Sequence, residues 1–235
     1  MKRSLVLFSG GIDSTVAAKE ELLQGNNPVL FTASSFAGEV EFDSAKKIAK
    51  ELGCEQVTVN LSPIQDLFRG GNLEFSLGAD LGGCPNDGFI AAPLSSNVLL
   101  MVALMYAAAN GFKRVVWGLN ADDVALVSKE DIDRHLELNM ALVKLRTGED
   151  IELVLPLLGL SKRQVLERGL AHGLPMHETR SCANKDAFDI CGKCSQCRAR
   201  ATAFAMCGDG DGQSQGAEVT TPEDEPQEVT HERDN

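Results

Sequence analysis

The sequence lacks an apolar run long enough to cross a membrane, because the apolar stretch 98–109 is too short and predicts a core helix instead. It also lacks a stripe of Lys and Arg with interleaved aromatic residues, and the net charge is −12, which disfavours binding to nucleic acid. No secretory signal is evident, so the seven cysteines are not expected to form disulfides and we expect a cytoplasmic protein.

The negative charge is concentrated at one end of the chain. Residues 208–235 contain nine carboxylates and one basic side chain, so this tail carries −8 and residues 1–207 carry −4. The tail is rich in Gly, Asp, Gln, Ser, Thr, Pro and Glu, and such a composition cannot bury enough apolar surface to become ordered. We therefore expect one domain of ordinary size followed by a disordered acidic tail at 208–235.

Apolar segments alternate with helical patterns along the first 207 residues. The pattern predicts strands at 3–8, 28–32, 56–60, 113–118 and 151–155. It predicts helices at about 14–24, 41–53, 93–110, 129–145, 161–171 and 196–207. This order indicates an α/β fold with a parallel five-stranded sheet and helices on both faces, and ligands of such sheets bind at the carboxyl ends of the strands.

The first predicted strand ends in the segment Ser9-Gly10-Gly11-Ile12-Asp13-Ser14-Thr15. Adjacent glycines let backbone N–H groups approach a ligand, hydroxyl groups add donors, and the start of a helix adds unpaired N–H groups and the positive end of its dipole. The segment therefore predicts an anion cradle. It has neither the Gly-Lys-Ser/Thr of a Walker A loop nor the dinucleotide Gly-x-Gly-x-x-Gly pattern. The alternative interpretation is a tight turn with well-capped helix ends.

Four cysteines, Cys182, Cys191, Cys194 and Cys197, form a C-x8-C-x2-C-x2-C pattern with a glycine inside it. Four thiolates at this spacing can surround one tetrahedral zinc ion and leave no ligand position open, so the predicted metal is structural. An iron–sulfur cluster is the main alternative, and disulfides or unliganded thiols are the others. Of the remaining cysteines, Cys54 is predicted to lie in the core, Cys84 in a glycine-rich loop and Cys207 at the end of the last helix.

The Ser-Gly-Gly-x-Asp-Ser order resembles the pyrophosphate loop (PP-loop) of ATP pyrophosphatases. Four further motifs, 118–123, 156–162, 179–184 and 191–198, extend the resemblance to the 7-cyano-7-deazaguanine synthase (QueC) family over most of residues 3–207. This resemblance implies an adenine nucleotide alpha hydrolase-like fold, cleavage of ATP to AMP and pyrophosphate, and conversion of 7-carboxy-7-deazaguanine with ammonia to an amide and then a nitrile. It also implies Mg²⁺, a cysteine-bound Zn²⁺ and a homodimer.

The resemblance further implies roles for individual residues. ATP contacts are expected from Phe8, Ser9, Gly10, Gly11, Ser14, Thr15, Thr32 and Gly118. Catalytic roles are expected for Asp13, Ser14, Lys162 and Asp123, and contacts to the deazaguanine ring for Asn120 and Asp123. Three alternatives stay open: Asp13 caps its helix or helps to bind Mg²⁺, Lys162 contacts the phosphates or is a solvated surface lysine, and Asp123 contacts Mg²⁺ or the ring edge. The expected division of the chain is an ATP-binding domain at 1–175, a zinc-binding lobe at 176–207 and the tail.

Three segments depart from the family pattern: 34–41, 89–97 and 124–130. They suggest an altered acceptor or substrate pocket, as in QueC-like proteins of bacterial antiphage systems that join a deazaguanine acid to another amine, such as a protein terminus. A PP-loop enzyme that transfers sulfur to tRNA is a second alternative. A non-enzymatic partner protein is a third, and the intact Ser-Gly-Gly-Ile-Asp-Ser-Thr loop argues against it.

Overall fold

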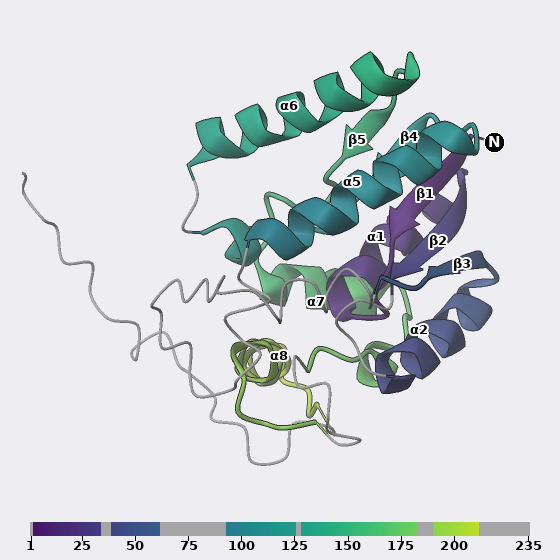
Figure 1. The fold of residues 1–235 in the computed structure, drawn as a ribbon. Helices are drawn as coiled ribbons and strands as arrows, with labels where there is room; N and C mark the ends of the chain where they lie inside the picture. Colours follow the sequence, from purple (N-terminus) through teal and green to yellow (C-terminus); the bar gives the residue numbers. More distant parts are fainter. Residues whose placement is uncertain (1, 34–38, 62–92, 126–127, 183–189, 212–235) are drawn as a thin grey trace, which may run out of the picture.

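The structure of the protein is a computed structural model that describes residues 2–33, 39–61, 93–125, 128–182 and 190–211 (Figure 1). The strands are β1 (Arg3–Leu7), β2 (Asn27–Ala33), β3 (Glu55–Val59), β4 (Arg114–Val116) and β5 (Glu152–Val154). The helices are α1 (Ile12–Leu23), α2 (Glu39–Leu52), α5 (Pro93–Ala109), α6 (Lys129–Thr147), α7 (Lys162–Ala171) and α8 (Ser195–Met206), with short 3₁₀ helices η1 (Asp122–Val124) and η2 (Met176–Glu178). The strands and helices predicted from the sequence agree with these bounds to within a few residues.

The strands form a five-stranded sheet in the order β3-β2-β1-β4-β5, and all four pairings are parallel. In the centre, Leu5 of β1 is paired with Val29 of β2 on one side and with Val115 of β4 on the other. The chain thus proceeds outward from β1 in one direction and later returns to add β4 and β5 in the other. Ligands of doubly wound sheets bind in the crevice beside such a reversal, so a site is expected at the carboxyl ends of β1 and β4.

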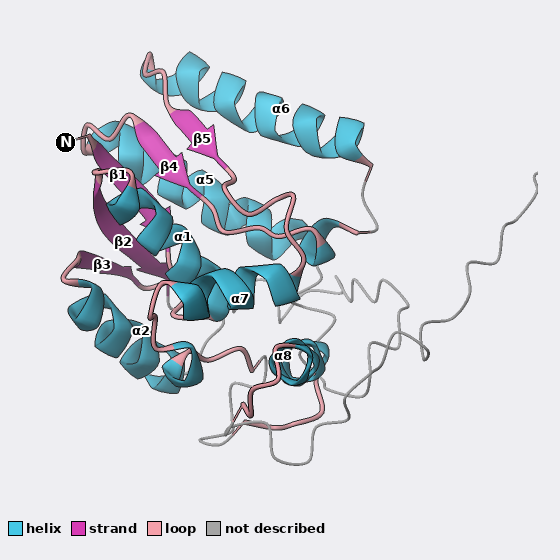
Figure 2. Ribbon diagram, turned by 180° about the vertical axis from the view of Figure 1, so that it is seen from behind, coloured by secondary structure: helices cyan, strands magenta, loops and turns pink. Residues whose placement is uncertain are grey.

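Successive residues of β1 face opposite sides of the sheet, as the two-residue period of a strand requires. Helices α5 and α6 lie on one side of the sheet, and α1, α2 and α7 lie on the other (Figures 1 and 2). Leu5 and Leu7 pack in a core with α5 and with Val143 of α6. Val6 packs in the opposite core with residues of α1, α2 and α7, and Phe204 of α8 belongs to the same cluster. Because helices cover both faces, the predicted two-sided α/β architecture is confirmed.

The C-terminal part of the described chain packs on the α1–α7 side of the sheet. Helix α8 contacts α7, and its Phe204 is fully buried in the core cluster. Asp211, which the sequence analysis places in the acidic tail, is buried and forms an ion pair with Arg200 of α8 at 2.7 Å. The docked chain therefore extends to Asp211, four residues beyond the predicted end of the folded part at Cys207.

Several predictions fall outside the described residues. They concern the greater part of the tail at 212–235, Cys84, and much of the three segments that depart from the family pattern. Among the residues that the structure does describe, no helix is both long and apolar enough to span a membrane.

Candidate functional site: a phosphate-sized loop and a four-cysteine cluster

The turn between β1 and α1 is built around two glycines that the surrounding backbone requires. Gly10 has φ of +77°, and a Cβ at this position would lie 2.7 Å from the Cα of Ala45 in α2. At Gly11, a Cβ would lie 3.1 Å from the carbonyl oxygen of Arg180. A side chain is therefore excluded at Gly10 by conformation and crowding, and at Gly11 it would require the neighbouring backbone to shift. The two glycines let the turn pack closely between α2 and the segment at Arg180.

Two hydroxyl groups hold the turn in shape. The backbone N–H of Ser9 donates to Oγ of Ser14 at 3.2 Å, Oγ of Ser14 donates to the carbonyl of Gly11 at 3.2 Å, and the two Oγ atoms are 3.3 Å apart. Helix α1 begins directly after Gly11, which provides no side-chain cap. The first N–H groups of any helix have no acceptor within the helix, and at the start of α1 the N-cap residue offers no side chain in its place. Helix starts of this kind bind phosphate in other proteins.

A charged group from a distant helix meets the first turn of α1. The ammonium group of Lys162, the first residue of α7, forms an ion pair with the carboxylate of Asp13. Lys162 is only 7% exposed, so the alternative of a solvated surface lysine is wrong. Asp13 does not cap α1, because its second carboxylate oxygen accepts a hydrogen bond at 3.0 Å from the side-chain amide of Asn120. The capping role considered for Asp13 is therefore also wrong.

The segment after β4 completes this edge of the sheet. Gly118 allows the strand end to approach α1, since a Cβ there would lie 3.0 Å from the carbonyl oxygen of Asp13. The side-chain carbonyl of buried Asn120 accepts the N–H groups of Asp122 at 2.8 Å and Asp123 at 3.2 Å. The structure thus brings the loop, Gly118, Asn120, Asp123 and Lys162 together at the carboxyl ends of β1 and β4.

The two neighbouring carboxylates of η1 have different surroundings. Asp122 accepts the backbone N–H of Lys162 at 2.8 Å and so fixes the start of α7, a contact that the sequence did not reveal. Asp123 accepts the backbone N–H of Asn120 at 3.0 Å and keeps solvent exposure. The protein packed around its carboxylate nevertheless raises the pKa of Asp123. The positive charge of Lys162 opposes this effect, and the negative charge of Asp13 reinforces it.

Three residues expected to contact ATP have their side chains elsewhere. The ring of Phe8 packs in the core and Thr15 is fully buried, so neither side chain reaches the surface of the loop. The hydroxyl of Thr32, at the carboxyl end of β2, accepts a hydrogen bond from the amide of Gln56 at 2.9 Å. At Phe8 and Thr15, any contact to a nucleotide in this arrangement has to come from the backbone.

The four predicted cysteine ligands converge at the start of α8. Their sulfur atoms all lie within 4.8 Å of one another, and those of Cys191 and Cys197 are 3.9 Å apart. Sulfur atoms bound tetrahedrally to zinc at about 2.3 Å are about 3.8 Å from each other, so the spacing fits one ion. None of the four is in a disulfide. The backbone N–H of Cys191 points at the sulfur of Cys182 at 3.4 Å, as expected where a thiolate accepts hydrogen bonds.

The family model described as "Queuosine biosynthesis protein QueC" matches residues 3–208. The chain belongs to the QueC family. A 7-cyano-7-deazaguanine synthase from Leptospira biflexa serovar Patoc is 32% identical to it, with 88% of this chain and 92% of that protein covered. One from Psychromonas ingrahamii is 28% identical, with 88% and 95% covered.

A solved structure of a different enzyme has a similar fold to this QueC chain. It is a 4-thiouridine synthetase in complex with RNA and bound ATP, and the two structures superpose with a TM-score of 0.50 at 20% sequence identity. The match covers 75% of this chain and 42% of the synthetase. At this identity the similarity concerns the fold alone.

Proposed function

We propose that this QueC protein uses ATP to adenylate 7-carboxy-7-deazaguanine and converts the activated acid with ammonia to the amide and then to 7-cyano-7-deazaguanine. The observation that supports the proposal most directly is the convergence of the Ser9–Ser14 loop, Lys162 and Asn120 at the crevice between β1 and β4. A carboxylate needs a better leaving group than hydroxide at neutral pH, and adenylation supplies AMP. The family membership makes a deazaguanine acid the first substrate to test.

In the first step of this mechanism, a carboxylate oxygen of the substrate attacks the α-phosphorus of ATP and pyrophosphate leaves. Negative charge develops on the departing pyrophosphate, so catalysis depends mostly on positioned donors. The hydroxyl groups of Ser9 and Ser14 and the N–H groups at the start of α1 are those donors. Lys162 adds a positive charge once its pairing with Asp13 is exchanged for the phosphates. Ammonia then attacks the acyl carbon and AMP leaves, which produces the amide.

In the second step, the amide oxygen attacks the α-phosphorus of a second ATP, and pyrophosphate leaves again. Loss of AMP and two protons from the amide nitrogen forms the nitrile. In the proposed complex, Asp123 holds the deazaguanine ring, because a carboxylate can accept two N–H donors from one ring edge. Asn120 is buried and its side chain bonds Asp13 and the backbone of η1, so it positions Asp123 and does not itself contact the ring. Gly118 and the backbone of Thr32 would lie on the nucleotide side of the crevice.

The donors near the loop suit Mg²⁺, which prefers carboxylate and phosphate oxygens, and Asp13 is the side chain that would share it with ATP. When bound, this ion would neutralise phosphate charge. The four sulfur donors at the start of α8 suit Zn²⁺, which would close the cluster without an open ligand position. We assign a structural role to that ion.

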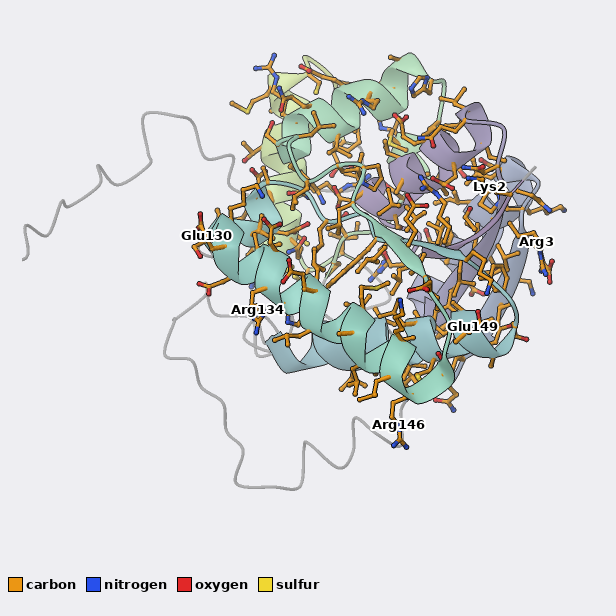
Figure 3. All side chains as sticks on the ribbon, turned by 90° about the horizontal axis from the view of Figure 1, so that it is seen from above. Lys2, Arg3, Glu130, Arg134, Arg146 and Glu149 are labelled. Atoms are coloured by element: carbon orange, nitrogen blue, oxygen red, sulfur yellow. The ribbon has the colours of Figure 1, made fainter. Side chains whose placement is uncertain are left out.

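We also propose that the protein forms a homodimer through α6. Leu138, Leu142 and Leu145 lie on one face of this helix and are 53%, 47% and 81% exposed, while Val143 faces the core. From Lys129 to Glu137 the helix has four acidic and two basic side chains, whereas residues 138–147 have only the basic Lys144 and Arg146. Figure 3 shows Glu130 and Arg146 at opposite ends of α6. Antiparallel packing of two copies would cover both leucine faces and bring unlike charges together.

The test of function is a reaction of the purified protein with ATP, Mg²⁺, 7-carboxy-7-deazaguanine and ammonium, followed by mass spectrometry. We expect the amide and the nitrile, with AMP and pyrophosphate released only when the acid is present. A parallel reaction replaces ammonium with a peptide amine, and a peptide conjugate formed there would favour the antiphage-type activity. Substrate-dependent release of ADP and phosphate would contradict the proposed chemistry altogether.

A further inference from the structure

The segment Met176–Arg180, here called the strap, crosses the outside of the pyrophosphate loop and contacts it through the backbone. The N–H of Arg180 donates to the carbonyl of Gly10 at 3.2 Å. The carbonyl oxygen of Arg180 would lie 3.1 Å from a Cβ atom at Gly11. The strap therefore sets how far the two glycines of the loop can move away from α1.

Helix α2 holds one side of the strap. The hydroxyl of Ser44 donates to the carbonyl of Glu178 at 2.9 Å, and the Glu178 carboxylate pairs with Lys47 at 2.8 Å. The adjoining residue of α2, Ala45, is the one that contacts Gly10. The loop is thus enclosed between α2 and the strap, which are themselves bonded to each other.

Arg200 of α8 holds the other side of the strap from within the protein. Its guanidinium is fully buried and donates to the carbonyl of Thr179 at 2.8 Å, to the hydroxyl of Thr179 at 2.7 Å and to the carbonyl of Met176 at 3.0 Å. Nε donates to the carboxylate of Asp211 at 2.7 Å, and the guanidinium lies 4.9 Å from the centre of the Phe204 ring. A rigid planar donor with these partners fixes the strap backbone immediately before Arg180.

We propose that Arg200 is a positioning residue for the pyrophosphate loop, acting through the backbone of Thr179 and Arg180. Arg200 itself does not contact the loop. It lies one helical turn after Cys197 in α8, so the same helix carries a cysteine of the cluster and the arginine that binds the strap. This inference rests on the proposed function, because it requires the loop to bind pyrophosphate. Its consequence is that a change at Arg200 weakens phosphate binding at a site that it does not touch.

The experiment measures binding of inorganic pyrophosphate with Mg²⁺ to the full-length protein, by calorimetry and by fluorescence of the single tryptophan, Trp117, which directly precedes Gly118. The variant is Arg200→Lys, and the matched control is Arg114→Lys. Arg114 also forms a largely buried pair, with Glu21 at 3.0 Å, but it lies at the amino end of β4, opposite the loop. Both variants lose an arginine from the interior, so a general loss of stability is common to both.

We expect Arg200→Lys to raise the Kd for pyrophosphate about tenfold or more while the far-ultraviolet circular dichroism is retained, and Arg114→Lys to leave the Kd unchanged. A folded Arg200→Lys protein that binds pyrophosphate like the wild type overturns the inference and leaves the proposed function intact. If the wild type itself binds neither pyrophosphate nor ATP, the proposed function fails and the inference fails with it.

A second pair of variants decides the matter if Arg200→Lys does not fold. Thr179→Ser keeps the hydroxyl that Arg200 binds, and Thr179→Val removes it with little change of volume. We expect weaker pyrophosphate binding by Thr179→Val and binding like the wild type by Thr179→Ser. Equal binding by the two folded proteins contradicts the positioning role.

Discussion

Replacing Asp211 by alanine removes the countercharge of a buried guanidinium. The Asp211 and Arg200 side chains are 5% and 0% exposed, and Nε of Arg200 lies 2.7 Å from the carboxylate. Removing one partner of a buried ion pair typically costs about 3–5 kcal/mol, because the other charge stays in the interior without compensation. Since Arg200 keeps its bonds to Met176 and Thr179, we expect the lower end of that range, about 3 kcal/mol. In a domain of this size that lowers Tm by about 6–12 °C.

Asp211→Asn separates the charge from the hydrogen bond. The amide oxygen can still accept from Arg200, so we expect a loss of about 1–2 kcal/mol, the difference between a charged and a neutral hydrogen bond. The control is Asp209→Ala, which removes the same charge two residues away. Asp209 is partly exposed and pairs with exposed His177 at 3.2 Å, so its loss should cost about 0–1 kcal/mol.

The assay is thermal and urea unfolding of the full-length variants, followed by circular dichroism. Two truncations provide an independent check, because a chain ending at residue 212 retains Asp211 and one ending at Cys207 lacks it. We expect the first to unfold like the full-length protein and the second like Asp211→Ala. Equal stability of Asp211→Ala and Asp209→Ala would refute the reasoning, as would equal stability of the two truncated chains.

Three further predictions concern the metal, the substrate and the assembly. Cys194→Ser should abolish binding of one zinc ion per chain and destabilise the region around α8. The zinc assignment would be contradicted if metal analysis of the anaerobically purified wild type found iron or no metal. Asp123→Asn should weaken use of the deazaguanine acid far more than it weakens ATP binding. The pKa of Asp123 is raised, so on acidification the wild-type activity should begin to fall at a higher pH than it would if this aspartate had its ordinary pKa. Leu142→Glu with Leu145→Glu should yield a monomer by light scattering, and a wild type that is already monomeric would exclude the α6 interface.

The fold could be predicted from the sequence because its signals are local. Buried parallel strands appear as short apolar runs such as 28–32, and the helices between them have clear limits, for example the Ser161 capping box at the start of α7. Once strands alternate with helices, the handedness of the crossovers leaves few arrangements, and the observed order places the carboxyl ends of β1 and β4 side by side. The expected roles of Asn120 and Lys162 come from the family resemblance, and this strand order explains why both lie near the loop.

The supports of the site could not be predicted, because their signals depend on the fold. Arg200 stands in the helical sequence Arg-Ala-Arg-Ala-Thr-Ala, where nothing distinguishes a buried arginine from the partly exposed Arg198 or from a surface cation. The residues around Asp211 have the composition of a disordered tail. Its carboxylate nevertheless pairs with the buried guanidinium of Arg200, and this ion pair holds the chain against the domain at that point. Residues that contact a ligand recur in recognisable motifs, since the chemistry restricts their type and spacing. Residues that hold the loop in place are restricted only by their neighbours in space, so Arg200 and Asp211 become visible only when the strap is seen between α2 and α8.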